Sequence, residues 1–160
     1  MQNSEAIWQL MEKVSDPEIP VLSVVDLGIV REVNVDTGAI EIVITPTYSG
    51  CPAMNTIEVN IKSVLEDHGI ENAKVKTVLS PAWTTDWLTP SGREKLLAYG
   101  IAPPVGRADK ASLFGEEKEI ACPQCGSTDT EMISQFGSTA CKSLYRCTSC
   151  LEPFDYFKCH

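Results

Sequence analysis

Two cysteine pairs decide how the last quarter of this chain folds: Cys-Pro-Gln-Cys-Gly at residues 122–126 and Cys-Thr-Ser-Cys at residues 147–150. Each pair separates its thiols by two residues, and 21 residues lie between the pairs. Such a turn presents two thiolates to one ion, and two turns complete the tetrahedron that zinc prefers, although iron also accepts four thiolates. The spacing predicts a zinc ribbon with the ligands Cys122, Cys125, Cys147 and Cys150.

The composition is typical of a globular protein in a reducing compartment. Of the 160 residues, 43% are hydrophobic and 22% are charged, which excludes a disordered chain. Residues 1–14 are amphipathic and acidic, unlike a signal peptide. No stretch approaches the roughly 20 apolar residues of a membrane span. The seven cysteines then favour thiolate-bound metal in the cytoplasm over secreted disulfides.

The charge distribution argues against a nucleic-acid partner. The net charge is −9, and the tail at 120–160 holds only three basic residues, Lys142, Arg146 and Lys158, against four acidic ones. Binding to a phosphate backbone usually needs a basic face. We therefore expect neither a nucleic-acid nor a membrane partner, and the sequence leaves the oligomeric state open.

Hydrophobic periodicity predicts an α/β (α+β) domain at 1–101, a charged and proline-containing linker at 102–119 and the ribbon module at 120–160. The domain should contain a sheet of three or more strands packed by helices. Ser4 is placed to cap its first helix, and Ser91 its last. The expected helices span 4–14, 54–68 and 91–98, and the expected strands span 30–35, 40–45 and 73–79.

Cys51 is the first candidate for chemistry outside the ribbon. It lies between the second strand and the second helix, beside Pro52, which suits a first helical turn. Partial positive charge at a helix N-terminus favours a thiolate, which binds soft metals or acts as a nucleophile. A small buried core cysteine is the alternative. A catalytic pair with His68 is not expected, because a helix of about 15 residues, roughly 22 Å long, separates them.

Two tryptophans follow the third strand. Trp83 and Trp87 are candidates for partner docking, since indoles often anchor interfaces, although packing within the protein is the commoner role. Asp16, Glu18 and Asp26 form an early acidic cluster, in which Asp16 is most simply a turn former.

Three further metal-binding or redox candidates lie in the tail: Cys141, Cys159 and His160. They could supply alternative ligands, a second metal site or a redox-active thiol pair. They could equally have no role beyond structure.

Several motifs resemble the iron–sulfur assembly domain shared by SufT-like proteins and eukaryotic cytosolic iron–sulfur targeting factors. They are Asp-Pro-Glu-Ile-Pro at 16–20, Val-Asp-Leu-Gly-Ile-Val at 25–30, Thr45, Gly-Cys-Pro at 50–52 and Pro-Ala-Trp at 81–83. Together with the ribbon, further motifs make the whole chain resemble the PaaD family of phenylacetate-degradation proteins. These motifs lie at 83–88, 100–104, 136–139 and 152–154.

The resemblance implies an iron–sulfur-assembly fold and a place in aerobic phenylacetate degradation through the CoA thioester. The implied partners are subunits of the phenylacetyl-CoA epoxidase, its di-iron oxygenase or its iron–sulfur reductase, which the chain would help to mature. The implied cofactors are zinc, bound by the family's ribbon ligands, and transient iron or an iron–sulfur cluster. Cys51 matches the cysteine proposed to handle that cargo in the wider family.

The residues themselves favour an accessory protein over an enzyme. The sequence has no Glu-x-x-His motif for a di-iron carboxylate site and no Gly-x-Gly-x-x-Gly fingerprint for a dinucleotide. A stable, non-catalytic subunit of the oxygenase complex is the first alternative. A thiol enzyme that uses Cys51, or Cys141 with Cys159, is the second, and it requires a depressed thiol pKa.

Overall fold

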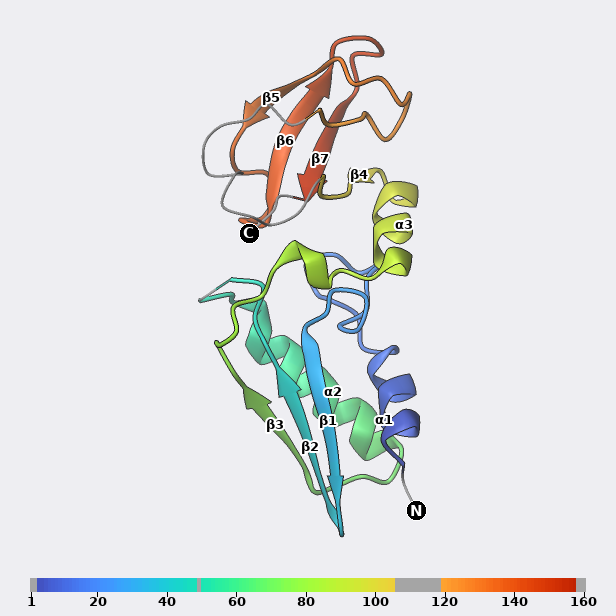
Figure 1. Ribbon diagram of the computed structural model, residues 1–160, viewed down its shortest axis with the longest axis vertical. Coiled ribbons are helices and arrows are strands. Elements are labelled where there is room, and N and C mark those ends of the chain that lie inside the picture. The colour runs from blue at the N-terminus through green and yellow to red at the C-terminus, as the bar shows by residue number, and fades with distance from the viewer. Residues whose placement is uncertain (1–2, 49, 106–118, 158–160) are drawn as a thin grey trace. The chain divides into compact units, whose positions relative to one another are not determined.

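The computed structural model describes residues 3–48, 50–105 and 119–157. The chain divides into two units, one of Met1–Trp83 with Trp87–Gly92 and one of Thr84–Asp86 with Arg93–His160. Each unit contains its own sheet, and the described residues include three α-helices (Figure 1). The predicted mixed α/β fold class is confirmed, whereas the domain boundaries at residues 101 and 119 stay a prediction.

A three-stranded sheet in the order β1-β2-β3 forms the centre of the first unit. Strand β1 (Val30–Asp36) pairs antiparallel with β2 (Ala39–Ile44), and β2 pairs parallel with β3 (Ala73–Thr77). The β1–β2 turn is tight because Gly38 adopts a φ of 90°. The parallel pair needs a crossover connection, which helix α2 (Ala53–Asp67) supplies.

Helices α1 (Ser4–Met11) and α2 pack on the sheet and provide the core of the first unit (Figure 1). Ile40, Ile42 and Ile44 of β2 are all buried, and Val43 between them is buried as well, so β2 alternates only in its first half. The helices contribute further buried side chains, those of Ile7, Met11, Ile57, Ile61 and Leu65.

Two helix caps differ from the sequence expectation. Asn3, not Ser4, caps α1, because its Oδ1 accepts the Ala6 N–H at 2.8 Å. A short 3₁₀ turn (Thr85–Trp87) precedes α3 (Pro90–Ala98), and there the Thr89 hydroxyl accepts the Gly92 N–H at 3.0 Å. In both places the cap lies one or two residues before the serine, where the chain is not yet helical.

The second unit contains a four-stranded sheet in the order β4-β7-β6-β5. The strands are β4 (Ile101–Ala102), β5 (Thr130–Ser134), β6 (Lys142–Cys147) and β7 (Pro153–Phe157). β4 runs parallel to β7, and the other pairs are antiparallel. One buried cluster consists of Ala102, Ile120, Cys122, Cys147, Phe154 and Tyr156, and Ile101, Cys141 and Phe157 of this unit are also buried. A unit of this size usually needs additional stabilisation, such as disulfides or a bound metal.

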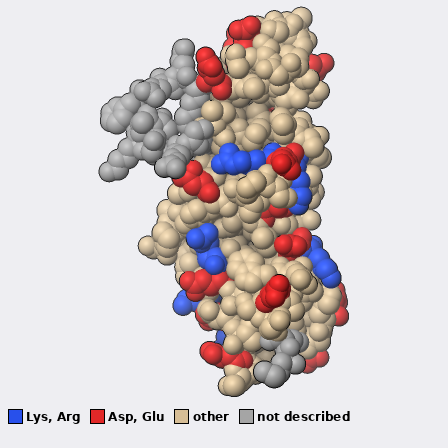
Figure 2. Space-filling view, turned by 45° about the vertical axis from the view of Figure 1, so that its right-hand side comes forward, with Lys and Arg blue, Asp and Glu red and all other residues tan. Residues whose placement is uncertain are grey.

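The surface carries both positively and negatively charged side chains. On the face seen in Figure 2, Lys and Arg groups are interspersed with Asp and Glu groups and form no continuous basic surface. Within the described part of the chain, none of the helices combines the length and the apolar character needed to span a bilayer.

Gly28 is the most constrained glycine of the first unit. Its φ is 69°, and a Cβ at this position would lie 2.4 Å from the carbonyl oxygen of Trp87 and 2.8 Å from its Cβ. We therefore expect Gly28→Ala to lower the free energy of unfolding by about 3 kcal/mol, because strain and overlap both act. Urea unfolding followed by tryptophan fluorescence measures this unit, since Trp8, Trp83 and Trp87 all belong to it.

Gly38→Ala is the matched control. Its φ is also positive, but a Cβ there meets nothing within 4 Å, so we expect a loss of only about 1 kcal/mol. Equal losses in the two variants would contradict the close approach of Gly28 to Trp87.

Candidate metal centre

Four sulfur atoms converge in the second unit. The Sγ atoms of Cys122, Cys125, Cys147 and Cys150 all lie within 4.8 Å of one another. Hydrogen bonds join the two turns that carry them. The Ser127 and Ser149 hydroxyl oxygens lie 2.9 Å apart, and the Thr148 N–H donates to the Asp129 carbonyl at 2.8 Å. The structure therefore brings together all four ribbon residues that the spacing predicts.

The sulfur separations fit a tetrahedral metal. A zinc–sulfur bond of about 2.3 Å corresponds to sulfur atoms about 3.8 Å apart. The pair Cys122 and Cys150 is separated by 3.7 Å, and the pair Cys125 and Cys147 by 3.5 Å. Four thiols at this distance repel one another when ionised unless a cation lies between them. This donor set suits zinc or another thiophilic metal.

Backbone N–H groups support the sulfur atoms. Gln124 N–H donates to Cys122 Sγ, and Cys150 N–H donates to Cys147 Sγ, each at 3.4 Å. Such bonds favour the thiolate, and those from the Cys150 and Ser149 backbones help to lower the pKa of Cys147 to about 7. Because four protein ligands fill a tetrahedron, a metal here has no open position and would supply structure.

Cys51 lies apart from this centre, in the loop from β2 to α2. Its side chain is half-buried. In the sequence Cys51 directly precedes Pro52, the N-cap residue of α2. The Ala53 backbone N–H and the Tyr48 side chain both favour the ionised form of this thiol. The Cys51 N–H donates to the Tyr48 carbonyl at 3.2 Å, which closes the loop. The sequence did not reveal Tyr48, because nothing in the pattern marks it as a partner of the thiol.

The electrostatics of Cys51 differ from the expectation. Burial raises the pKa of this thiol, and the nearby Glu18 and Asp16 carboxylates raise it further. The hydrogen bonds from Ala53 and Tyr48 lower the pKa but do not outweigh these effects. The N-terminal N–H group of α2 thus favours the thiolate as expected, but burial and the two carboxylates outweigh it, and the net pKa of Cys51 is raised. A raised pKa also removes support for a thiol enzyme.

The early acidic residues have structural roles. Asp16 Oδ1 accepts the N–H groups of Glu18 and Ile19, both at 2.8 Å, so this residue is the expected turn former. Asp26 Oδ2 accepts the Ser23 N–H at 3.0 Å. The turn also brings the Glu18 and Asp16 charges near Cys51, and the only sequence signal for this was the family motif at 16–20.

Both candidate docking tryptophans take part in packing. Trp83 is 4% exposed, and its indole N–H donates to the Leu27 carbonyl at 2.8 Å. The guanidinium carbon of Arg31 lies 3.4 Å from the ring centroid of the half-buried Trp87, a cation–π contact. Partner docking through this loop stays a prediction.

Of the secondary candidates, only Cys141 lies among the described residues, and it is not part of the four-sulfur group. Cys141 is buried, with its Sγ 3.0 Å from the Thr139 hydroxyl oxygen. Cys159 and His160 lie outside the described residues. His68 ends α2, at the opposite end from Cys51, and its Nδ1 lies 2.8 Å from the Val64 carbonyl.

Comparisons with known proteins assign a family to each part of the chain. A family described as "Iron-sulfur cluster assembly protein" matches residues 4–79, and the "PaaD zinc beta ribbon domain" matches residues 106–158. An Escherichia coli K12 protein, named as one of the subunits of a "Putative 1,2-phenylacetyl-CoA epoxidase", is 52% identical over 96% of this chain and 91% of its own length. The chain belongs to the PaaD family.

Other relatives match only about three fifths of this PaaD-family chain. Proteins named "Fe-S protein maturation auxiliary factor" from Porphyromonas gingivalis and Bacillus subtilis are 33% and 35% identical, over 63% and 61% of this chain and 94% and 93% of their own lengths. A solved domain of unknown function from Bacillus anthracis has a TM-score of 0.55 and 28% identity, covering 58% of this chain and 90% of that one. A conserved hypothetical protein from Thermotoga maritima has a TM-score of 0.51 and 27% identity, covering 59% and 94%.

The metal centre can be tested by removing one ligand. We expect Cys125→Ser to lose bound metal and the cooperative unfolding of the second unit, because three thiolates no longer complete the tetrahedron. Metal content by mass spectrometry and protease resistance of the tail measure the two effects. Cys141→Ala is the matched control, and it should retain the metal. Full metal retention in Cys125→Ser would exclude that residue as a ligand.

The environment of Cys51 can be tested by titration. We expect Cys51 to be alkylated with a pKa above that of a free thiol, and Glu18→Gln to lower this pKa, because removal of a nearby negative charge favours the thiolate. The alkylation rate of the Cys51 peptide as a function of pH, followed by mass spectrometry, measures both values. Glu12→Gln removes an exposed charge of α1's C-terminal end and should leave the pKa unchanged. An unchanged or higher pKa in Glu18→Gln would contradict the assigned role of that carboxylate.

Proposed function

We infer that this PaaD-family chain is an accessory protein that handles iron or an iron–sulfur species through Cys51 during maturation of the phenylacetyl-CoA epoxidase. The observation that carries the proposal is the setting of that thiol: half-exposed, at the start of α2, with two hydrogen-bond donors and two carboxylates nearby. The names of the relatives, which refer to the epoxidase and to Fe-S protein maturation, support it.

The chemistry of Cys51 suits a transient carrier. A cationic iron species is attracted by the Glu18 and Asp16 carboxylates and displaces the proton that the raised pKa leaves on the sulfur. The Tyr48 and Ala53 donors stabilise the resulting sulfur charge. A single protein thiolate leaves the cargo with coordination positions for a recipient, and reprotonation of the sulfur favours release.

The ribbon centre suits a different role. Its four thiolates would hold zinc in a closed site, which stabilises the fold and exchanges slowly. We assign no catalytic step to it. The partners in this proposal are the di-iron oxygenase or the iron–sulfur reductase of the epoxidase, and the cell compartment is the cytoplasm.

The proposal predicts that cargo loading of the client depends on Cys51. When the epoxidase subunits are coexpressed with Cys51→Ser, we expect their iron and acid-labile sulfide to fall to the level obtained without this chain. The thiol is lost, but the fold is kept, because Cys51 is only half-buried. Metal and sulfide analysis of the purified oxygenase and reductase measures the effect and identifies the client.

Cys141→Ser is the thiol-matched control and should support normal loading. Normal loading by a folded Cys51→Ser variant would contradict the proposal. The circular dichroism spectrum of each variant establishes that it is folded.

A stable, non-catalytic subunit of the oxygenase complex is the second candidate. The name of the full-length Escherichia coli relative, which describes that protein as part of the epoxidase itself, favours it. This candidate requires stoichiometric co-purification with the other epoxidase subunits, with unchanged loading in Cys51→Ser. Dissociation under mild conditions counts against it.

A further inference from the structure

A cavity of about 480 Å³ lies in the first unit, between the β1–β2 turn and the loop from α2 to β3. Two buried isoleucines, Ile40 and Ile70, form its apolar floor. Most other lining residues are exposed, so the cavity is a groove that is open to solvent. The sequence patterns did not indicate that these two segments lie together.

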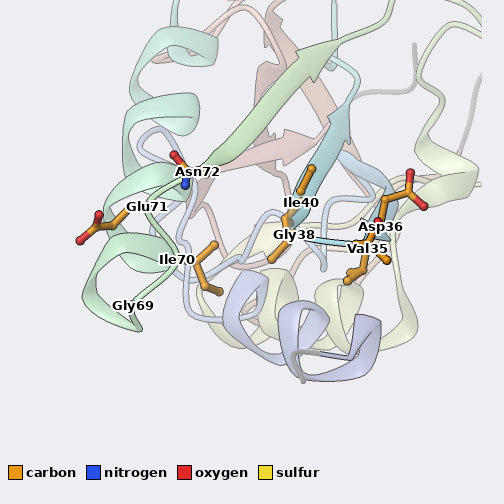
Figure 3. A pocket seen from close by; sticks show the side chains of 10 residues that line it. Val35, Asp36, Gly38, Ile40, Gly69, Ile70, Glu71 and Asn72 are labelled. Carbon is orange, nitrogen blue, oxygen red and sulfur yellow. The ribbon is translucent and has the colours of Figure 1, made fainter.

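The two charged residues that line this groove, Asp36 and Glu71, are both acidic. In Figure 3, Ile70 and Ile40 lie between Glu71 on one side and Asp36 on the other, and both carboxylates are at the margins. No Lys or Arg lines the groove. The last turn of the adjacent helix α2 also contains no basic residue, so its partial negative charge adds to that of the carboxylates.

Lys13 is a cation at this end of α2, but it does not line the groove. Its Nζ lies 3.4 Å from Nε2 of His68. The groove therefore presents two negative charges separated by an apolar floor, and neither is neutralised by a lining residue.

This arrangement selects against several ligand classes. An anionic nucleotide or CoA group would meet like charge and no basic partner. A metal ion needs converging ligands, and the group of potential metal ligands found among the described residues is the four-cysteine set. Two separated carboxylates instead suit two separate cationic side chains, with an apolar group between them.

We propose that this groove is a docking site for an extended basic–apolar–basic segment of a protein partner. The apolar side chain lies on Ile40 and Ile70, and the flanking Lys or Arg side chains reach Asp36 and Glu71, with their aliphatic stems covering the apolar surface. The net charge of −9 favours encounter with such a basic segment.

The groove is separate from Cys51. It adjoins the C-terminal end of α2, whereas Cys51 precedes the N-terminal end, and a helix of 15 residues is about 22 Å long. A partner bound in the groove leaves the Cys51 loop free. Docking here goes beyond the delivery function and does not depend on it, since it can be measured without any cargo.

The experiment uses the full chain with its metal and a fluorescein-labelled peptide, acetyl-Lys-Arg-Leu-Arg-Lys-amide. We expect saturable binding by fluorescence anisotropy, weakened when salt is raised from about 0.05 to about 0.5 M. Amide shifts in ¹⁵N-correlated NMR spectra should centre on Gly38, Gly69 and Asn72. Peptides with Ser for Leu, or with Gln for all four basic residues, should bind more weakly.

Asp36→Asn combined with Glu71→Gln should weaken binding about fivefold, because two exposed charge pairs are lost. Glu12→Gln combined with Glu94→Gln removes the same charge from exposed positions outside the groove and should bind like the wild type. Equal weakening by both pairs of substitutions would overturn the proposal, as would amide shifts centred elsewhere. Undiminished binding of the Gln-containing peptide would also overturn it and indicate a neutral apolar ligand.

Discussion

Mutual repulsion among four sulfur atoms is the constraint on which the second unit depends. As thiolates within 4.8 Å of one another they repel, and a divalent cation removes that repulsion. The two cysteine turns lie before β5 and between β6 and β7, so fixing the sulfur positions also fixes how these strands meet. The unit buries few large side chains, among them Ile120, Phe154, Tyr156 and Phe157, and domains with so small a core usually gain stability from a bound metal.

The first unit uses cysteine in the opposite way. Its sheet and helices bury many apolar side chains, and the single thiol of Cys51 is half-buried in the loop from β2 to α2. Its raised pKa leaves the sulfur protonated when nothing is bound. Under the proposed function, the chain combines a permanent metal site with a transient one, and the difference lies in the number of thiolates and the neighbouring charge.

Sequence patterns predicted the parts of this structure that rest on local spacing. The cysteine spacing identified the four-sulfur group, and periodicity located the helices and the strands of the first unit to within a few residues. Strand β4 could not be predicted, because its two residues carry no period and its partner β7 lies far along the chain. The pKa of Cys51 and the acidic groove also depend on residues that only the tertiary fold brings together, such as Glu18 near Cys51 and Ile70 near Ile40.

The most direct test of the account is the zinc, iron and acid-labile sulfide content of the chain purified without oxygen, as wild type and as Cys51→Ser. A transient carrier with a structural ribbon predicts about one zinc per chain in both proteins, because four thiolates hold one ion. It also predicts iron or sulfide in the wild type that is lost in Cys51→Ser. Zinc alone in both proteins, or iron that persists in Cys51→Ser, would contradict the assignment of the cargo to Cys51.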